Sequence, residues 1–269
     1  MESIIAQKLN PALHPVVLLK SDLKPEKALQ PKSGKYLCIM SLFAQSVAKG
    51  KTVVFDRETY ACPGACAGLG FGTAYDKALG GYDTFSAFFS KGIEDAEDPE
   101  KYREFAEKMP THVSKKLIQG ERFHCNREKA LKWISEELPL FDFPETYRII
   151  KPLSELQEGE TPLSVIFTVN PMHMTTLITL NGAINEGINE TVTPQGAACQ
   201  MIGNYVFNEA KKENPKTVMG LLDLAARHNV KNVLPEDVLT YAMPWEVFLE
   251  MEKEAETGIF ESPLWLNLQ

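Results

Sequence analysis

The sequence predicts an α/β fold, with an α+β arrangement as the alternative. Short apolar segments rich in β-branched residues alternate along the chain with segments of helical periodicity. One order of elements (strand, helix, short strand, cysteine-bearing turn, helix) occurs in each half. A diverged internal duplication would explain this repeated β-α-β-α order, and so would chance similarity between two common α/β arrangements. We therefore predict lobes at residues 1–145 and 146–269 that share one core in a single compact unit.

The first lobe is predicted from two apolar runs and the periodic segment between them. PVVLLK and TVVF are short and rich in β-branched residues, as buried strands are. Between them, apolar residues recur at helical spacing up to Gly50, and glycine commonly ends a helix. Several prolines predict an irregular boundary segment over 139–152. The predicted elements are strands at 15–20 and 52–55 and helices at 36–48, 90–118 and 127–138.

The second lobe is predicted from LSVIFTV at 163–169, the clearest buried strand in the chain. Pro171 follows at a first-turn position, where the missing N–H of proline does not weaken a helix. The turn from Gly196 to Cys199 leads into a helix that reaches about residue 212. The other predicted elements are strands at 190–193 and 218–221 and helices at 171–181, 235–241 and 245–257.

The composition indicates a folded protein that binds neither nucleic acid nor membrane. Of 269 residues, 44% are hydrophobic and 24% charged, which is typical of globular proteins. A net charge of −8 opposes binding to phosphate-rich partners, because these require a basic field. We find no secretory signal and no apolar run long enough to span a bilayer. We therefore expect a cytoplasmic protein without structural disulfides.

The residues most able to carry chemistry are cysteines. Cys38, Cys62 and Cys199 are each predicted near the start of a helix, where the pKa of a thiol is lowered and its thiolate can bind metal or attack a substrate. Cys66 lies four residues after Cys62, which is not the C-x-x-C spacing of thiol oxidoreductases. Cys125 is either a peripheral thiol or the fourth member of a ligand set. A buried hydrophobic role is the alternative for every one of them.

Glycines and arginines suggest a second kind of site. Gly64 and Gly196 would let the backbone approach a ligand closely, and Arg57 and Arg227 could face an anionic small molecule. The glycines at 68, 70 and 72 lack the spacing of the dinucleotide fingerprint, so tight packing is the favoured interpretation.

Asp223 lies four residues before Arg227 on the same predicted helical face. This spacing predicts a simple ion pair between the two side chains.

Several blocks of the sequence resemble the domain of unknown function 169 family, from about residue 10 to the end. They are CIMSLFAQSVAKGKTVVFDRETYACPGACAGLGFG, VIFTVNPMHMTTLITLNGA, TPQGAACQMIG, PKTVMGLLDLAAR and PEDVLTYAMPWEVFLEME. The family is spread through anaerobic bacteria and archaea, and the resemblance implies no particular activity. It implies shared cysteines at Cys38, Cys62 and Cys199, whereas at Cys66 and Cys125 the family more often has glycine or a polar residue.

Three shared cysteines in an anaerobic setting suggest a [4Fe–4S] cluster in which one iron lacks a cysteine ligand. The leading hypothesis is therefore a metal- or iron–sulfur-binding protein, with Cys38, Cys62 and Cys199 as ligands in a seam between the lobes and Cys66 as a candidate fourth. The alternatives are a metal-free protein that binds a small anion and a thiol enzyme with Cys62 as nucleophile. The sequence assigns neither a substrate nor an oligomeric state.

Overall fold

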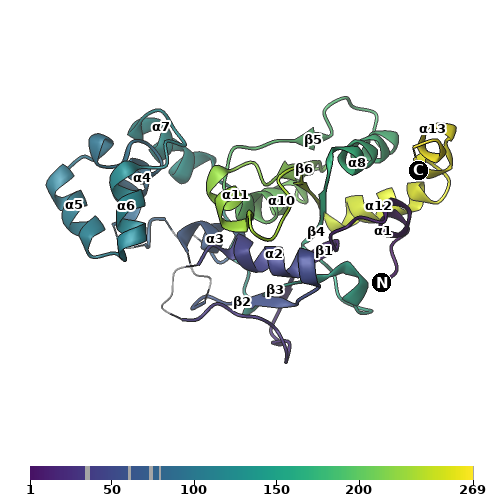
Figure 1. Ribbon diagram of the computed structural model, residues 1–269, viewed down its shortest axis with the longest axis horizontal. Helices are drawn as coiled ribbons and strands as arrows, with labels where there is room; N and C mark the ends of the chain where they lie inside the picture. The colour runs from purple at the N-terminus through teal and green to yellow at the C-terminus, as the bar shows by residue number, and fades with distance from the viewer. Residues whose placement is uncertain (34–36, 60–61, 73–74, 79, 269) are drawn as a thin grey trace. The chain divides into compact units, whose positions relative to one another are not determined.

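The structure, a computed structural model, contains a seven-stranded mixed sheet (Figure 1). It describes residues 1–33, 37–59, 62–72, 75–78 and 80–268. The strand order is β2-β3-β1-β4-β7-β6-β5, and every neighbouring pair is antiparallel except β5 and β6, which are parallel. The strands are β1 (Val16–Ser21), β2 (Val53–Phe55), β3 (Tyr147–Pro152), β4 (Ser164–Val169), β5 (Thr191–Val192), β6 (Thr217–Gly220) and β7 (Leu239–Met243).

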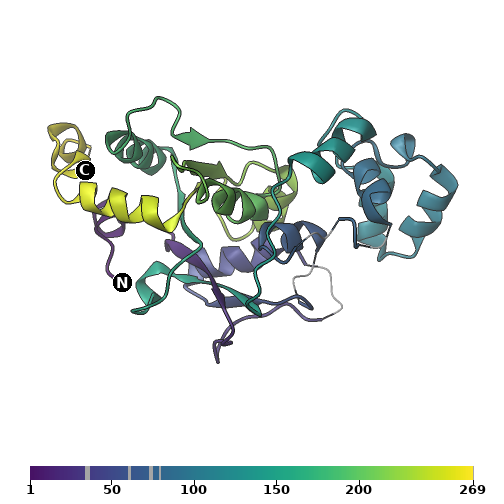
Figure 2. The same ribbon diagram turned by 180° about the vertical axis from the view of Figure 1, so that it is seen from behind.

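One face of this sheet is covered by helices from both ends of the chain. Alternate residues of a strand point to the same face, so Val165, Phe167 and Val169 of β4 all enter this core. They meet side chains such as Leu177 and Phe248, and α12 lies in front of the sheet in Figure 2. The helices here are α1 (Ile4–Leu9), α8 (Pro171–Ala183), α12 (Trp245–Ala255) and α13 (Pro263–Leu266).

The helices that carry the cysteines cover the opposite face. The buried side of α2 includes Met40, Phe43 and Val47 and packs on β2 and β3, while α9 and α10 pack on β6. Helix α9 also contacts both α2 and α3. The helices on this face are α2 (Ile39–Lys49), α3 (Pro63–Gly68), α9 (Ala198–Met201), α10 (Asn204–Glu209) and α11 (Leu224–Val230).

Residues 73–140 form a compact unit of their own, and the sheet unit comprises residues 1–72 and 141–269. The smaller unit is helical, and its core includes Tyr102, Ala106 and Leu117 together with packed rings of Phe89 and Trp133. Its helices are α4 (Gly81–Phe88), α5 (Pro99–Glu107), α6 (Thr111–Gln119) and α7 (Arg127–Lys132), followed by a single π-helical turn at Trp133–Glu137.

The strongest sequence patterns are confirmed. Strands β1, β2 and β4 and helices α8 and α12 lie within a few residues of their predicted bounds. The helix predicted over 36–48 is α2, which begins at Ile39, and Tyr36 lies outside the described residues.

Four predicted segments were wrong. The helix predicted over 90–118 is divided into a 3-10 turn at Gly92–Asp95 and the helices α5 and α6. The segment predicted to be irregular, 139–152, contains β3, whose Arg148 and Lys151 obscure its strand pattern. The segment predicted as a helix at 235–241 ends in β7, because the starting proline leads into a turn rather than a helix. The helix predicted to reach residue 212 is divided at Gly203 into α9 and α10.

The internal duplication is not confirmed. Both predicted cysteine turns follow an edge strand, but β2 is antiparallel to its neighbour whereas β5 is parallel to its own. The two compact units of the structure also differ from the lobes predicted at 1–145 and 146–269. Those lobes stay a prediction from the sequence.

Candidate functional site

Each of the three leading cysteines lies at the start of a helix, as predicted. Cys38 and Cys62 are the N-cap residues of α2 and α3, and Cys199 is the second residue of α9. The Cys62 sulfur accepts a hydrogen bond from the backbone N–H of Ala65 at 3.3 Å and a further one from that of Gly64. The sulfur thus occupies the capping position that a serine or aspartate oxygen commonly takes.

Two glycines bring the cysteine helices α3 and α9 into direct backbone contact. A Cβ atom at Gly203 would overlap the carbonyl oxygen of Gly68, and one at Gly68 would lie 2.8 Å from the carbonyl oxygen of Cys199. Only glycine fits at either position, because the neighbouring atoms belong to the backbone and cannot rotate away. This contact fixes the turn of Cys199 against the helix that Cys62 caps.

We expect Gly203→Ala to separate these helices and lower the free energy of unfolding by about 1–3 kcal/mol, the usual cost of overpacking. Gly182→Ala is the matched control, since a Cβ at Gly182 in α8 would contact nothing within 4 Å. Urea unfolding of the two variants and the wild type measures the difference. Equal stability of the Gly203→Ala variant and the wild type would contradict the proposed close contact.

The three cysteines lie close enough together for their charges to interact. Charge on Cys38 affects Cys62, and charge on either Cys38 or Cys62 affects Cys199. Cys199 is buried, whereas Cys38 and Cys62 keep partial exposure. In the part of the chain that the structure describes, no three His, Cys, Asp or Glu side chains are arranged to hold a metal ion.

Burial changes the acidity of these thiols in the direction opposite to the sequence-based expectation. Burial, with a smaller contribution from Cys38, raises the pKa of Cys62 to about 12, although the N–H groups of Ala65 and Gly64 oppose the shift. Burial also raises the pKa of Cys199 well above its ordinary value. Helix starts were expected to lower these pKa values, but the reduced solvation of the two sulfur atoms outweighs the N–H donors. At neutral pH both side chains are thiols rather than thiolates.

We therefore expect slow alkylation of Cys62 and Cys199 in metal-free protein. The exposed Cys125 should react first in iodoacetamide at pH 8, because reagent reaches it freely. The rate at Cys62 should keep rising with pH up to about 12, since the thiolate is the reacting form. Mass spectrometry of digested samples measures each site. Preferential labelling of Cys62 at pH 8 would show that its pKa is low and contradict this result.

The other two cysteines have different surroundings. The buried Cys66 thiol donates to the carbonyl oxygen of Phe71 at 3.7 Å. It lies near enough to Cys62 for their charges to interact, but this is the weakest of the effects on Cys62. Cys125 is exposed and belongs to the smaller unit. All five cysteines are described and none forms a disulfide.

The predicted anion-binding residues contact the protein itself. Arg57 donates to the carbonyl oxygens of Phe71 and Phe143 and forms an ion pair with Asp142 at 2.5 Å. Arg227 donates to two backbone carbonyls. Gly64 supplies an N–H to Cys62, and a Cβ at Gly196 would meet the ring of Tyr205. The glycine at 196 thus accommodates a packed ring.

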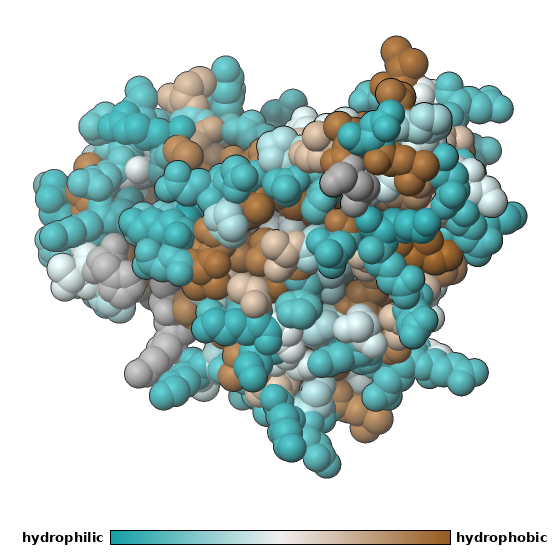
Figure 3. Space-filling view, turned by 45° about the vertical axis from the view of Figure 1, so that its right-hand side comes forward, coloured by the Kyte–Doolittle hydropathy of each residue, from teal (hydrophilic) through white to brown (hydrophobic). Residues whose placement is uncertain are grey.

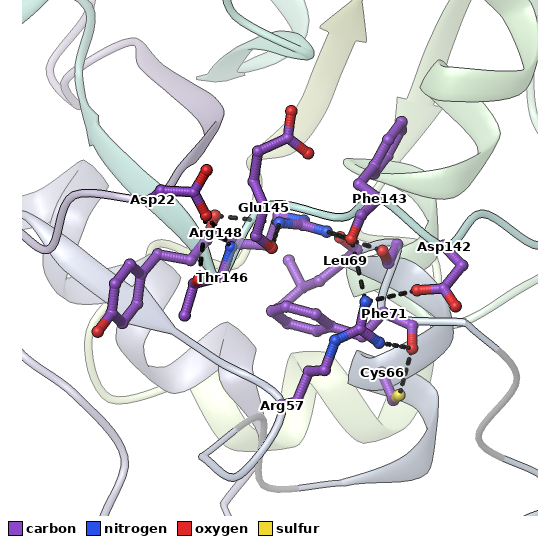
Figure 4. A network of polar contacts seen from close by, with 12 residues as sticks. Asp22, Arg57, Cys66, Leu69, Phe71, Asp142, Phe143, Glu145, Thr146 and Arg148 are labelled. Atoms are coloured by element: carbon purple, nitrogen blue, oxygen red, sulfur yellow. Dashed lines mark hydrogen bonds and ion pairs between the residues drawn. The ribbon is translucent and has the colours of Figure 1, made fainter.

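The structure adds a buried arginine that the sequence patterns did not suggest. Arg148 on β3 is completely buried, and burial lowers its pKa to about 10, so it stays charged at neutral pH. Its guanidinium donates to the carbonyl oxygens of Leu69 at 2.8 Å and Gly70 at 2.9 Å, where α3 ends (Figure 4). It also stacks over the ring of Phe71, 4.5 Å from the centroid. Arg148 thereby fixes the end of the helix that Cys62 begins.

The guanidinium of Arg148 also donates to the segment that leads into β3. It binds the carbonyl oxygens of Phe143, Glu145 and Tyr147 at 2.9–3.1 Å. Arg148 therefore ties two segments distant in sequence, and its position between Tyr147 and Ile149 in an apolar run is the signal that could have indicated it.

Asp223 also has a role that the sequence did not predict. Instead of pairing with Arg227, its carboxylate caps α11 by accepting from the Ala226 N–H at 2.6 Å. The other oxygen accepts a short hydrogen bond from the backbone N–H of Ala198, next to Cys199. Burial raises the pKa of Asp223, while these N–H groups act in the opposite direction.

Hydrophobic residues reach the surface in several separate places (Figure 3). The most exposed include Ile188, Leu224 and Leu264. Over the described residues, every helix is too short or too polar to cross a bilayer.

The fold is that of an α/β protein in which three cysteines lie at helix starts on one face of the sheet. The chain belongs to the DUF169 family, described as uncharacterised ArCR, whose family model matches residues 4–254. This confirms the resemblance found in the sequence. No curated protein and no solved structure matches the chain.

Proposed function

We propose that Cys38, Cys62 and Cys199 bind a [4Fe–4S] cluster with one iron that has no cysteine ligand. The observation that carries this proposal is the gathering of three cysteines from three separate helix starts into one charge-coupled group. In such a cluster each cysteine binds a different iron, so the cysteine sulfurs lie farther apart than the sulfur ligands of a single metal ion. Three separate helix starts can therefore each supply one ligand.

The surroundings of Cys62 suit a metal-bound sulfur. Backbone N–H groups of Gly64 and Ala65 point at it, and hydrogen bonds to cluster sulfurs are one means by which proteins set reduction potentials. Because the buried thiols hold their protons without metal, iron binding would release them, as metals deprotonate coordinating thiols outright. Metal binding should therefore stabilise the folded chain.

The fourth iron provides the chemistry in this proposal. An iron with an open coordination position can bind and polarise a small molecule as a Lewis acid does. The partial exposure of Cys38 and Cys62 gives this side of the group access to solvent. We therefore propose a small-molecule ligand or substrate at that iron.

The two alternative functions have less support. An anion site at Arg57 or Arg227 would have to compete with the backbone carbonyls that these guanidiniums already bind. A nucleophilic Cys62 would need a lowered pKa, whereas burial raises it.

Anaerobic purification tests the cluster. We expect a brown protein whose broad visible absorption is bleached by dithionite, with about four iron and four sulfide per chain. Reconstitution with ferrous iron and sulfide should restore these contents after chelation. Protein that stays colourless and iron-free after both procedures would exclude the proposal.

A further inference from the structure

We infer that Asp223 is a positioning residue that holds the first turn of α9, and with it Cys199, and that its charge sets the reduction potential of the bound cluster. The second part of this inference rests on the proposed function. The first part concerns the protein chain alone and can be tested without metal.

The carboxylate of Asp223 joins two helix starts. One oxygen caps α11 through Ala226, and the other accepts from Ala198, the first residue of α9. Helix α9 has only four residues, and its N-cap Ala197 offers no side-chain oxygen. Within α9 itself, the Gln200 side-chain oxygen accepts from the Ala197 N–H at 2.8 Å, and Asp223 supplies from a distant segment the acceptor for the next N–H, that of Ala198.

The backbone around Asp223 is strained to reach this position. Leu221, two residues earlier, is completely buried and has a φ of 62°, in the left-handed region that a bulky side chain rarely adopts. Arg227 donates from Nε to the Leu221 carbonyl at 2.9 Å, and from Nη1 to the Glu236 carbonyl at 3.0 Å. Strain of this kind persists only where the surroundings impose it, and here it delivers Asp223 to the turn of Cys199.

Asp223 also places a charge beside the site. It lies near enough to Cys199 for the two charges to interact. A fixed negative charge near a cluster disfavours the added electron of the reduced state and so lowers the potential. Removing this charge should shift the potential to a more positive value.

Two substitutions at this position both remove the charge and keep different parts of the cap. Asp223→Ser keeps a good N-cap for α11, but its single short hydroxyl cannot also accept from Ala198. Asp223→Asn keeps the size and one acceptor oxygen while removing the charge. Asp98→Ser is the matched control, because Asp98 caps α5 in the smaller unit by accepting from Lys101 at 3.0 Å.

The first measurement is hydrogen exchange of the Ala198 backbone N–H in metal-free protein, followed by mass spectrometry. We expect the rate to rise about tenfold in Asp223→Ser, the effect of losing one charge-assisted hydrogen bond, and to stay unchanged in Asp98→Ser. An unchanged rate in Asp223→Ser would overturn the positioning role. If circular dichroism shows that Asp223→Ser is unfolded, Asp223→Asn decides the same question, with a faster rate expected and an unchanged rate overturning it.

The second measurement is a redox titration of the anaerobic, cluster-loaded protein. We expect a more positive midpoint potential in Asp223→Asn and the wild-type potential in Asp98→Ser. An unshifted Asp223→Asn potential would overturn the electrostatic role. Faster exchange of the Ala198 N–H in Asp223→Ser, in protein that never takes up iron, would refute the proposed function and, with it, the proposed effect on the potential, while supporting the positioning role.

Discussion

Replacing Cys62 with serine is expected to remove the visible colour and most of the iron from anaerobically purified protein. Serine is a poor ligand for iron in such clusters, and the loss removes one of three cysteine attachments. Thermal stability should also fall, because metal binding contributes folding free energy. Iron content, absorption spectra and thermal unfolding, measured on the same preparations, provide the three readouts.

Cys66→Ser is the matched control for this substitution. It lies on the same helix, and a serine hydroxyl can still donate to the Phe71 carbonyl that the Cys66 thiol contacts. We expect it to keep wild-type iron and colour. Equal iron in the wild type and in Cys62→Ser would refute Cys62 as a ligand, and loss of iron in Cys66→Ser would make Cys66 a ligand. A loss of about 1–3 kcal/mol in Cys62→Ser, with no spectroscopic change from a metal-free wild type, would instead identify Cys62 as a buried hydrophobic residue.

Arg148→Met is expected to lower the free energy of unfolding by about 3–5 kcal/mol, the range for removing one partner from a buried charged network. Methionine fills similar volume but removes the guanidinium donors from the carbonyl oxygens of Leu69 and Gly70, of which Gly70 still accepts from the Phe143 N–H. Since these carbonyls end α3, the variant should also bind less iron. Urea unfolding of metal-free protein measures the change in the free energy of unfolding separately from the change in iron binding.

Arg57→Met tests whether any arginine in this network would have the same effect. Arg57 donates to neighbouring carbonyls too, but its side chain is 47% exposed and its ion pair with Asp142 is solvated. We expect a loss of about 1 kcal/mol. Similar losses in the two variants would contradict the special importance of the buried guanidinium.

Local sequence patterns predicted the strands and helices whose burial pattern is regular and whose ends have clear signals. β4 is buried on both faces, and α8 and α12 have clear starts at prolines or capping residues. β3 was missed because Arg148 breaks its apolar pattern, and the reason for a buried arginine there is a set of carbonyls at residues 69–70 and 143–147. No window of sequence around β3 contains the first of these partners.

The candidate site was predicted only in part for the same reason. Residue type and helix starts indicated Cys38, Cys62 and Cys199, and the structure brings all three together. The direction of the pKa shifts could not be predicted, because it depends on burial by segments distant in sequence. The role of Asp223 likewise depends on Ala198, which lies 25 positions earlier in the chain.

The most direct test of the central claim is Mössbauer spectroscopy of anaerobically prepared, isotope-labelled wild-type protein. We expect a [4Fe–4S] spectrum in which one iron differs from the other three, because three cysteines leave that iron with a different ligand. Adding a small ligand such as cyanide should change the signal of that iron alone. A spectrum with no cluster, or one with a single iron in a mononuclear site, would contradict the assignment of Cys38, Cys62 and Cys199 as cluster ligands.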